Sequence, residues 1–192
     1  MLAPYPPPPT LERRKSVQDR IVRNRNADRM SDAVMQYLPA DRAHPDLGDK
    51  ADLYGRLIGS WELDNNRYDE QTGEWRRNSG ECHFRWILGG RAVQDLWGSP
   101  SRGFGTTVRA YDAGLDAWRV HWFAPKYESF CILIGRADGD DIRQEGTQQD
   151  GRPIRWDIVD ITPSSFTWRG EISDDDGATW RLEQEMRARR RR

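Results

Sequence analysis

The stretch Ala117–Ala124, which reads AWRVHWFA, alternates large apolar residues with polar ones. Because successive side chains of a β-strand point to opposite faces, this spacing predicts a strand that buries Trp118 and Trp122. Arg119 and His121 then face outward, which argues against His121 as a general base, although its ordinary pKa of about 6.5 suits that role. A β-bulge before the strand would exchange the two faces.

The same alternation continues on both sides of this stretch, where short turn sequences separate apolar segments of strand length. Short turns join antiparallel neighbours, and a long meander is free of bare edges only if it closes. We therefore predict an all-β fold, an antiparallel up-and-down barrel of about ten strands. The predicted strands are Ser60–Asp69, Glu74–Leu88, Arg91–Trp97, Phe104–Tyr111, Ala117–Ala124, Tyr127–Arg136, Asp141–Gln149, Pro153–Ile161, Ser165–Ile172 and Thr179–Arg187.

Tryptophans mark the predicted interior of this barrel. Seven of the nine fall on the apolar faces of the predicted strands, and rings this large need cover from water. The seven are Trp61, Trp86, Trp118, Trp122, Trp156, Trp168 and Trp180. The sequence therefore predicts an interior lined with indole rings, either as a cavity or as a filled core.

The first 48 residues differ in composition from the predicted barrel. The prolines of Pro4–Pro9 favour an extended segment, and helices are predicted over Thr10–Arg25 and Ser31–Leu38, followed by a linker over Pro39–Leu47. A short helix over Asp49–Ile58, capped by Asp49, leads into the first strand. We predict a Pro-rich and helical N-terminal extension over residues 1–48, a barrel domain over 49–187 and a frayed basic tail over 188–192.

Composition argues against several classes of protein. A net charge of −1, without basic residues interleaved with exposed aromatics, argues against a nucleic-acid partner. No apolar run approaches the roughly 18 residues that a membrane helix needs, and no secretory signal is visible, so we expect a cytoplasmic protein. Cys82 and Cys131 lie in predicted strands, where buried, reduced thiols are expected.

Three motifs carry a family resemblance. Gly59-Ser60-Trp61, after a short helix, resembles the Gly-x-Trp opening of lipocalin-type barrels, and Leu88-Gly89-Gly90-Arg91 follows at the third strand. Tyr111-Asp112, one hairpin before Trp118 and Trp122, completes an order similar to a bacterial family of lipocalin-like, calycin-type domains. The resemblance covers roughly residues 53–187 and implies that Trp61 plugs the closed end of a barrel holding a small hydrophobic or amphipathic ligand. It names no reaction.

Cofactor and metal sites lack their usual residues. Ten-stranded haem-binding barrels such as nitrobindin use a histidine late in the chain as the iron ligand, whereas this chain has only His44, His83 and His121. Cys82 and His83 are adjacent on a strand and therefore point to opposite faces, which prevents joint chelation of zinc. We expect no cofactor and no metal.

Strand parity selects the candidate ligand-binding residues. On the first strand Asn65 and Arg67 share the face of Trp61, and Gln144 shares the face of Ile142. Inward polar groups among aromatic rings are typical of a small-molecule pocket. The candidate ligand-binding residues are Trp86, Trp118, Trp122, Trp156, Trp168, Asn65, Arg67 and Gln144.

Three charged residues are candidates for catalysis. Glu128 shares a face with Phe130, Ile132 and Ile134, where a carboxylate is either protonated or paired with a cation. We also assign Arg91 and Asp95 to the interior, with Trp97 on the same face. Any of the three could donate a proton or stabilise charge, but a place at the water-filled mouth would leave Glu128 without a role.

Three functions remain open. The first is the binding of a hydrophobic or aromatic small molecule. The second is a cofactor-independent enzyme, of a cyclase, isomerase or hydratase type, acting on such a molecule. The third is a scaffold or interaction protein with a filled core. The first strands and the N-terminal helix also leave open a homodimer, formed by addition to a neighbouring edge.

Overall fold

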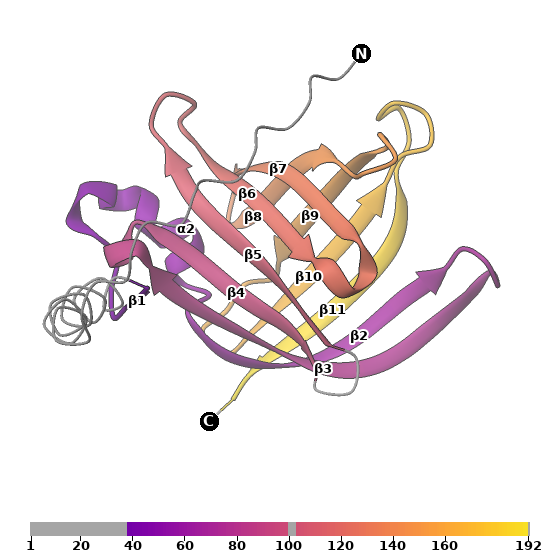
Figure 1. Cartoon of the computed structure of the whole chain (residues 1–192), viewed down its shortest axis with the longest axis horizontal. Coiled ribbons are helices and arrows are strands. Elements are labelled where there is room, and N and C mark those ends of the chain that lie inside the picture. The colour runs from indigo at the N-terminus through magenta and orange to yellow at the C-terminus, as the bar shows by residue number, and fades with distance from the viewer. Residues whose placement is uncertain (1–37, 100–102, 192) are drawn as a thin grey trace, which may run out of the picture. The chain divides into compact units, whose positions relative to one another are not determined.

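Ten antiparallel strands close into a barrel in the computed structural model, which describes residues 38–99 and 103–191 (Figure 1). Each strand pairs with the strands before and after it in the chain, and the last, β11, pairs with β2 to complete the ring. This confirms the predicted all-β up-and-down barrel. The strands are β2 (Gly59–Asp69), β3 (Glu74–Ile87), β4 (Ala92–Ser99), β5 (Gly103–Asp112), β6 (Ala117–Ala124), β7 (Ser129–Asp138), β8 (Asp141–Thr147), β9 (Pro153–Val159), β10 (Ser165–Ile172) and β11 (Arg181–Arg190).

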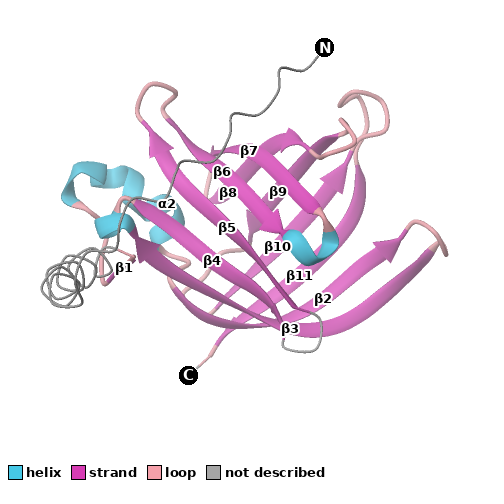
Figure 2. Cartoon of the chain, in the orientation of Figure 1, coloured by secondary structure: helices cyan, strands magenta, loops and turns pink. Residues whose placement is uncertain are grey.

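Helical turns precede β2 at one end of the barrel (Figure 2). The predicted short helix is present as a 3-10 turn, η1 (Pro45–Ala51), followed by α2 (Asp52–Gly55). His44 caps η1 in place of Asp49, because its Nδ1 accepts the Asp46 N–H at 3.2 Å. Two single turns, η2 (Leu88–Gly90) and η3 (Pro125–Tyr127), join β3 to β4 and β6 to β7. No helix in the described ranges is long and apolar enough to cross a membrane.

Residues 39–47, where we predicted a linker, contact the barrel. The two-residue strand β1 (Pro39–Ala40) pairs with Ile87 and Trp86 of β3, and the His44 N–H donates to the Gly90 carbonyl at 2.9 Å. The proline run, the helix over Thr10–Arg25 and all but the last residue of the helix over Ser31–Leu38 lie outside the described residues. The boundary between an extension over residues 1–48 and the barrel domain stays a prediction.

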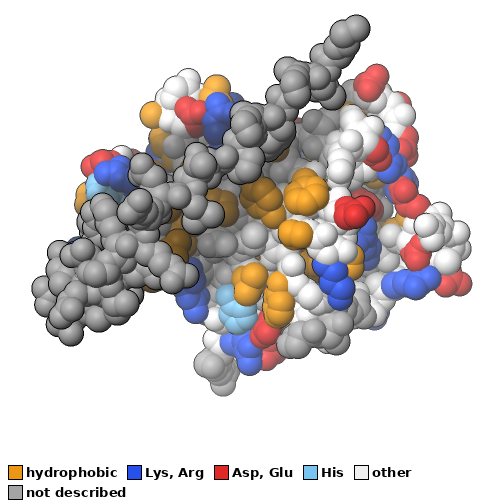
Figure 3. Space-filling view, in the orientation of Figure 1, with side chains coloured by type: hydrophobic (Ala, Val, Ile, Leu, Met, Phe, Trp, Pro, Cys, Tyr) orange, Lys and Arg blue, Asp and Glu red, His pale blue; other side chains and the backbone are white. Residues whose placement is uncertain are grey.

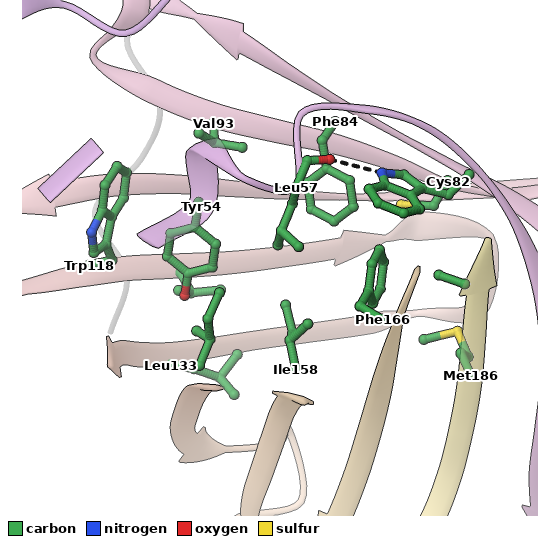
Figure 4. Close-up of a cluster of buried hydrophobic side chains, with 14 of the residues drawn as sticks. Tyr54, Leu57, Cys82, Phe84, Val93, Trp118, Leu133, Ile158, Phe166 and Met186 are labelled. Atoms are coloured by element: carbon green, nitrogen blue, oxygen red, sulfur yellow. Dashed lines mark hydrogen bonds between the residues drawn. The ribbon is translucent and has the colours of Figure 1, made fainter. Parts of the chain in front are cut away.

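The closed end of the barrel is filled by side chains from α2 and the turn after it. Tyr54 and Leu57 are fully buried and point into the barrel (Figure 4). Trp61 is also fully buried, its Nε1 donates to the Leu57 carbonyl at 2.8 Å, and its ring packs edge-on against Phe166. Trp61 therefore occupies the plug position that the Gly-x-Trp resemblance implies.

The C-terminal arginines belong to the barrel, so the prediction of a frayed tail is wrong for residues 188–190. Strand β11 continues to Arg190, whose guanidinium lies 4.0 Å from the centroid of the Trp61 ring. Its Nη1 and Nη2 donate to the carbonyls of Ile58 and Arg56, at 2.7 and 3.2 Å. The chain end stays ordered here because Arg190 satisfies carbonyls left without partners after α2.

The predicted inward faces are right for six of the seven tryptophans. Trp61, Trp86 and Trp118 belong to the buried core, and Trp122, Trp156 and Trp168 line the inner wall. Trp180 is the exception, because it precedes β11 in the β10–β11 loop and stacks under the Arg155 guanidinium at 4.0 Å. A loop residue does not follow the pleat, so its parity carried no information.

Candidate functional site

A cavity of about 390 Å³ opens at the end of the barrel opposite α2. The loops that follow β2, β6, β8 and β10 lie at this end, and the β2–β3 hairpin extends beyond it (Figure 1). Figure 3, in the orientation of Figure 1, looks at the side of the barrel, where hydrophobic side chains at the centre of the face in view are surrounded by charged ones. A cavity of this size lies within the roughly 300–1,000 Å³ of typical small-molecule sites.

Four tryptophans form a continuous belt on the cavity wall. Ring centroids are 6.0 Å apart between Trp97 and Trp122, 6.1 Å between Trp122 and Trp156, and 5.5 Å between Trp156 and Trp168. We call these four residues the indole belt. They come from β4, β6, β9 and β10, so the belt follows the wall across strands rather than along one strand. The ring planes are inclined by 58–86° to one another, so the wall is made of both faces and edges of indole rings.

Two glycines on the inner face make room for the belt. A Cβ at Gly105 would lie 2.2 Å from the Trp122 ring, and one at Gly170 would lie 2.5 Å from the Trp168 ring. Both indoles therefore lie directly against backbone. The Trp122 Nε1 donates to the Ser129 hydroxyl at 3.2 Å, which fixes the orientation of its ring.

The cavity floor holds a buried ion pair. Arg109 of β5 and Asp95 of β4 are 3% and 5% exposed, and the Arg109 Nη1 lies 2.8 Å from the Asp95 Oδ2. The other oxygen of Asp95 accepts the backbone N–H of Thr107 at 2.9 Å. Burial removes the hydration of both charges. The close contact between them and the hydrogen bond from Thr107 must compensate for the hydration free energy that is lost.

Aromatic rings and amides hold Arg109 from the side of the closed end. Its guanidinium carbon lies 5.1 Å from the Tyr54 ring centroid and 5.4 Å from that of Phe84, both within cation–π range. Its Nε donates to the Gln144 Oε1 at 3.3 Å, and Tyr54 donates to the same oxygen at 3.2 Å. Burial lowers the pKa of Arg109, but Asp95, together with Tyr54 and Cys82, outweighs this and the pKa is raised, so the guanidinium stays charged.

The part of the cavity wall formed by β2, β3 and β11 carries a chain of hydrogen-bonded amide side chains. Gln184 of β11 donates to the Asn65 Oδ1 at 2.8 Å, and Asn65 donates to the Asn78 Oδ1 at 3.2 Å. Arg67 lines the cavity near its mouth, where it is 61% exposed and 3.8 Å from Glu183. The cavity thus has an aromatic wall, an amide wall and an ionic floor.

The predicted ligand-binding residues divide into two groups. Trp122, Trp156, Trp168, Asn65 and Arg67 line the cavity. The other three belong to the packing beneath it and do not line it: Trp86, Trp118 and Gln144. Their inward direction was predicted, but their depth was not, because parity gives the face of a strand and not the height along it.

Glu128 and Arg91 lie outside the cavity, so the prediction that they face the interior is wrong. Glu128 follows η3 with φ +50° and is exposed, and this turn shifts the alternation so that Cys131 and Leu133 face inward on β7. Arg91 precedes β4 and pairs with Asp46 at 2.8 Å on the surface. Of the three candidates for catalysis, only Asp95 lines the cavity.

Sequence reasoning missed Arg109. On β5 the more apolar set, Phe104 and Val108, faces outward, and the set containing Arg109 and Gly105 faces inward. An assignment of faces by polarity alone would therefore place Phe104 and Val108 inside the barrel and Arg109 outside it, the reverse of what the structure has. The available signal was the glycine, because a strand residue without a side chain leaves room for a large ring on the inner face.

Both cysteines line the cavity as free thiols. Burial raises the pKa of Cys131 to about 11, and it raises that of Cys82 well above its usual range. Neither thiol is activated as a nucleophile at neutral pH. Within the described ranges, no group of three or more His, Cys, Asp or Glu side chains is placed to hold a metal ion.

Four charged side chains connect three loops at the cavity rim. Arg152 and Arg181 each contact both Glu70 and Asp174, at distances from 2.7 to 3.4 Å. We call these residues the rim network. Hydrogen bonds from Arg181 and Arg152 lower the pKa of Glu70, and those from Arg152 and Arg181 lower the pKa of Asp174. The network ties together the β2–β3, β8–β9 and β10–β11 connections.

We expect the rim network to stabilise the protein above about pH 4.5 and to lose its effect in acid. A carboxyl whose folded pKa is lowered stabilises the fold above its unfolded pKa, and the contribution is lost as pH falls through the folded value. Glu70→Gln with Asp174→Asn should lower the thermal midpoint at pH 7, and the gap to the wild type should narrow towards pH 2.5. The effect is small because these side chains are largely exposed.

Glu74→Gln, an exposed carboxyl of the same hairpin, is the matched control and should change the midpoint little at either pH. A gap that stays constant from pH 7 to pH 2.5 would show that the carboxyl charges do not contribute through this network.

Neither a protein-family model nor a curated protein matches the sequence. A solved structure with a similar backbone is that of an S-type phycobiliprotein lyase from Guillardia theta. The TM-score is 0.50 at 10% identity, over 73% of this chain and 92% of the lyase chain. A likeness at this identity shows the fold alone. The lipocalin-like barrel is thus shown, whereas membership of the bacterial lipocalin-like domain family stays a prediction.

Proposed function

We propose that the barrel binds a hydrophobic, aromatic small molecule in the cavity above Arg109. The observation that carries this proposal is the indole belt, whose rings lie against one another at 5.5–6.1 Å around an open cavity. Burying apolar ligand surface against such a wall contributes about 25 cal/mol per Å², and ring stacking adds to it. The polar floor and the amide wall supply the few oriented groups that such sites use for specificity.

The alternative of a cofactor-independent enzyme has less support. Asp95 is its one remaining candidate, and both carboxylate oxygens are engaged, by Arg109 and by the Thr107 N–H. The phycobiliprotein lyase is an enzyme with a similar barrel, but that likeness is an analogy of fold.

Titration with fluorene, a flat tricyclic hydrocarbon, tests the proposal. We expect it to quench tryptophan emission of the wild type and to raise the thermal midpoint, because ligand bound to the folded state stabilises it by mass action. Met186 lines the cavity and is 8% exposed, so Met186→Trp adds an indole to the space itself. This variant should lose at least tenfold in affinity for fluorene, read from the concentration dependence of the midpoint shift.

Leu96→Trp is the control, because Leu96 lies on the outer face of β4 and is 43% exposed. It should bind fluorene as the wild type does. If no compound from a broad aromatic panel changes emission or midpoint, or if Met186→Trp binds fluorene unchanged, the cavity is not the ligand site.

A further inference from the structure

Arg109 has one unused donor group. Its Nε donates to Gln144 and its Nη1 to Asp95, whereas Nη2 has no hydrogen-bond partner among the described residues. Arg109 nevertheless lines the cavity. A guanidinium can donate through all three of its nitrogens, and Nη2, unlike the buried side-chain atoms that lack a partner, keeps accessible surface, so it is free to donate to an acceptor that enters the cavity.

The position of this donor is fixed before any ligand arrives. The guanidinium lies between the Tyr54 and Phe84 rings and is held by two hydrogen bonds, so it has little freedom to turn. Binding to a donor that is already oriented costs little side-chain entropy. The arrangement is therefore suited to recognising an acceptor of defined position.

A second donor on the same wall also lacks an acceptor. The indole nitrogen of Trp97, two residues beyond Asp95 on β4, is buried without a hydrogen-bond partner. Trp122 in the same belt differs, because its nitrogen has Ser129. An unpaired buried N–H is costly, and because this nitrogen has almost no accessible surface, a turn of the Trp97 ring towards an acceptor in the cavity would be needed to relieve that cost.

The charge of the cavity selects among acceptors. The charged residues of the described cavity wall are two arginines and two acids, Arg67 with Glu183 and Arg109 with Asp95. A carboxylate or phosphate beside Arg109 would bring a second negative charge close to Asp95 in a site removed from water. A neutral acceptor avoids that repulsion.

We infer that the ligand is a flat aromatic molecule with a neutral hydrogen-bond acceptor, such as the carbonyl of an aromatic ketone, to which Arg109 Nη2 donates at the cavity floor. This inference rests on the proposed function and adds the polar group that the ligand carries. Trp97 contributes from the wall above, and the indole belt holds the rings.

Fluorenone and fluorene share one tricyclic skeleton and differ in a carbonyl group, so the ratio of their dissociation constants tests the inference. We expect the wild type to bind fluorenone about tenfold more tightly than fluorene, which corresponds to a difference in binding free energy of ~1.4 kcal/mol. Fluorene-9-carboxylate should bind more weakly than fluorenone. Asp95→Asn with Arg109→Met removes both charges and keeps an acceptor for Thr107, and it should bring the ratio close to one while fluorene still binds.

The matched control removes an Asp–Arg pair from the surface: Asp112→Asn with Arg119→Met, whose side chains are 2.6 Å apart outside the cavity. It should keep the wild-type ratio. We call Asp95→Asn with Arg109→Met the floor variant. If it does not fold, Trp97→Phe provides the test and should reduce the ratio of the fluorene to the fluorenone dissociation constant.

A wild type that binds fluorene as tightly as fluorenone, or prefers the carboxylate, overturns the inference and leaves the proposed function standing. A ratio unchanged in both the floor variant and Trp97→Phe also overturns it. Failure of both neutral probes to bind overturns the proposed function as well.

Discussion

Arg109→Met alone is expected to destabilise the barrel by about 3–5 kcal/mol, the cost of leaving a buried partner charge uncompensated. Asp95 would remain 5% exposed with the Thr107 N–H as its hydrogen-bond donor, and Gln144 would lose the Arg109 Nε. Urea unfolding of the variant and of the wild type measures the loss.

The double variant Asp95→Asn with Arg109→Met separates the missing partner from the missing packing. Replacing both charges of a buried pair is often nearly neutral, so this variant should recover most of the lost free energy of unfolding. A double variant as unstable as Arg109→Met would mean that the packing of Arg109 between Tyr54 and Phe84, and not its charge, stabilises the cavity floor.

Trp61→Ala is expected to destabilise the protein by about 3–5 kcal/mol, the usual cost of deleting a fully buried tryptophan. The substitution removes the contact with Phe166, the hydrogen bond to the Leu57 carbonyl and the ring beneath Arg190. Because these contacts join the turn after α2 to β10 and β11, the closed end should lose cooperativity together with stability. Denaturant unfolding followed by far-ultraviolet circular dichroism measures the change.

Trp75→Ala is the control for the loss of an indole, because Trp75 is 44% exposed on the β2–β3 hairpin. It should cost well under 1 kcal/mol. If Trp61→Ala is equally mild, the tryptophan of the Gly-x-Trp motif is not the plug of the barrel.

Strand parity was sufficient to predict the barrel and much of its inner face. The alternation in Ala117–Ala124 gives Trp118 and Trp122 the buried side, and the structure places both there. Asn65, Asp95 and Gln144 were also predicted to face inward, and all three are buried. The rule works here because these residues lie within long, regular ladders, where each side chain follows the pleat.

The errors arise where the pleat is interrupted. Glu128 sits at φ +50° directly after η3, and such a turn changes which residues of the next strand face inward. Trp180 lies in a loop, where parity has no meaning. The position of a residue along the barrel axis could not be predicted either. Trp86 and Trp156 have similar neighbours in the sequence, although only Trp156 lines the cavity.

The ion pair on the floor could not be read from one strand. Arg109 and Asp95 lie on different strands, and their pairing depends on the register in which Val93 stands opposite Arg109. A sequence gives the faces of two strands but not the offset between them. The residue that defines the polar end of the cavity therefore emerges only from the structure.

A crystal structure of the protein grown with fluorenone would locate the ligand. We expect one fluorenone molecule in the barrel, its rings against the indole belt and its oxygen within about 3.2 Å of Arg109 Nη2. A barrel whose tryptophans fill the space themselves, with fluorenone on the outer surface, would contradict both the proposed function and the role of Arg109.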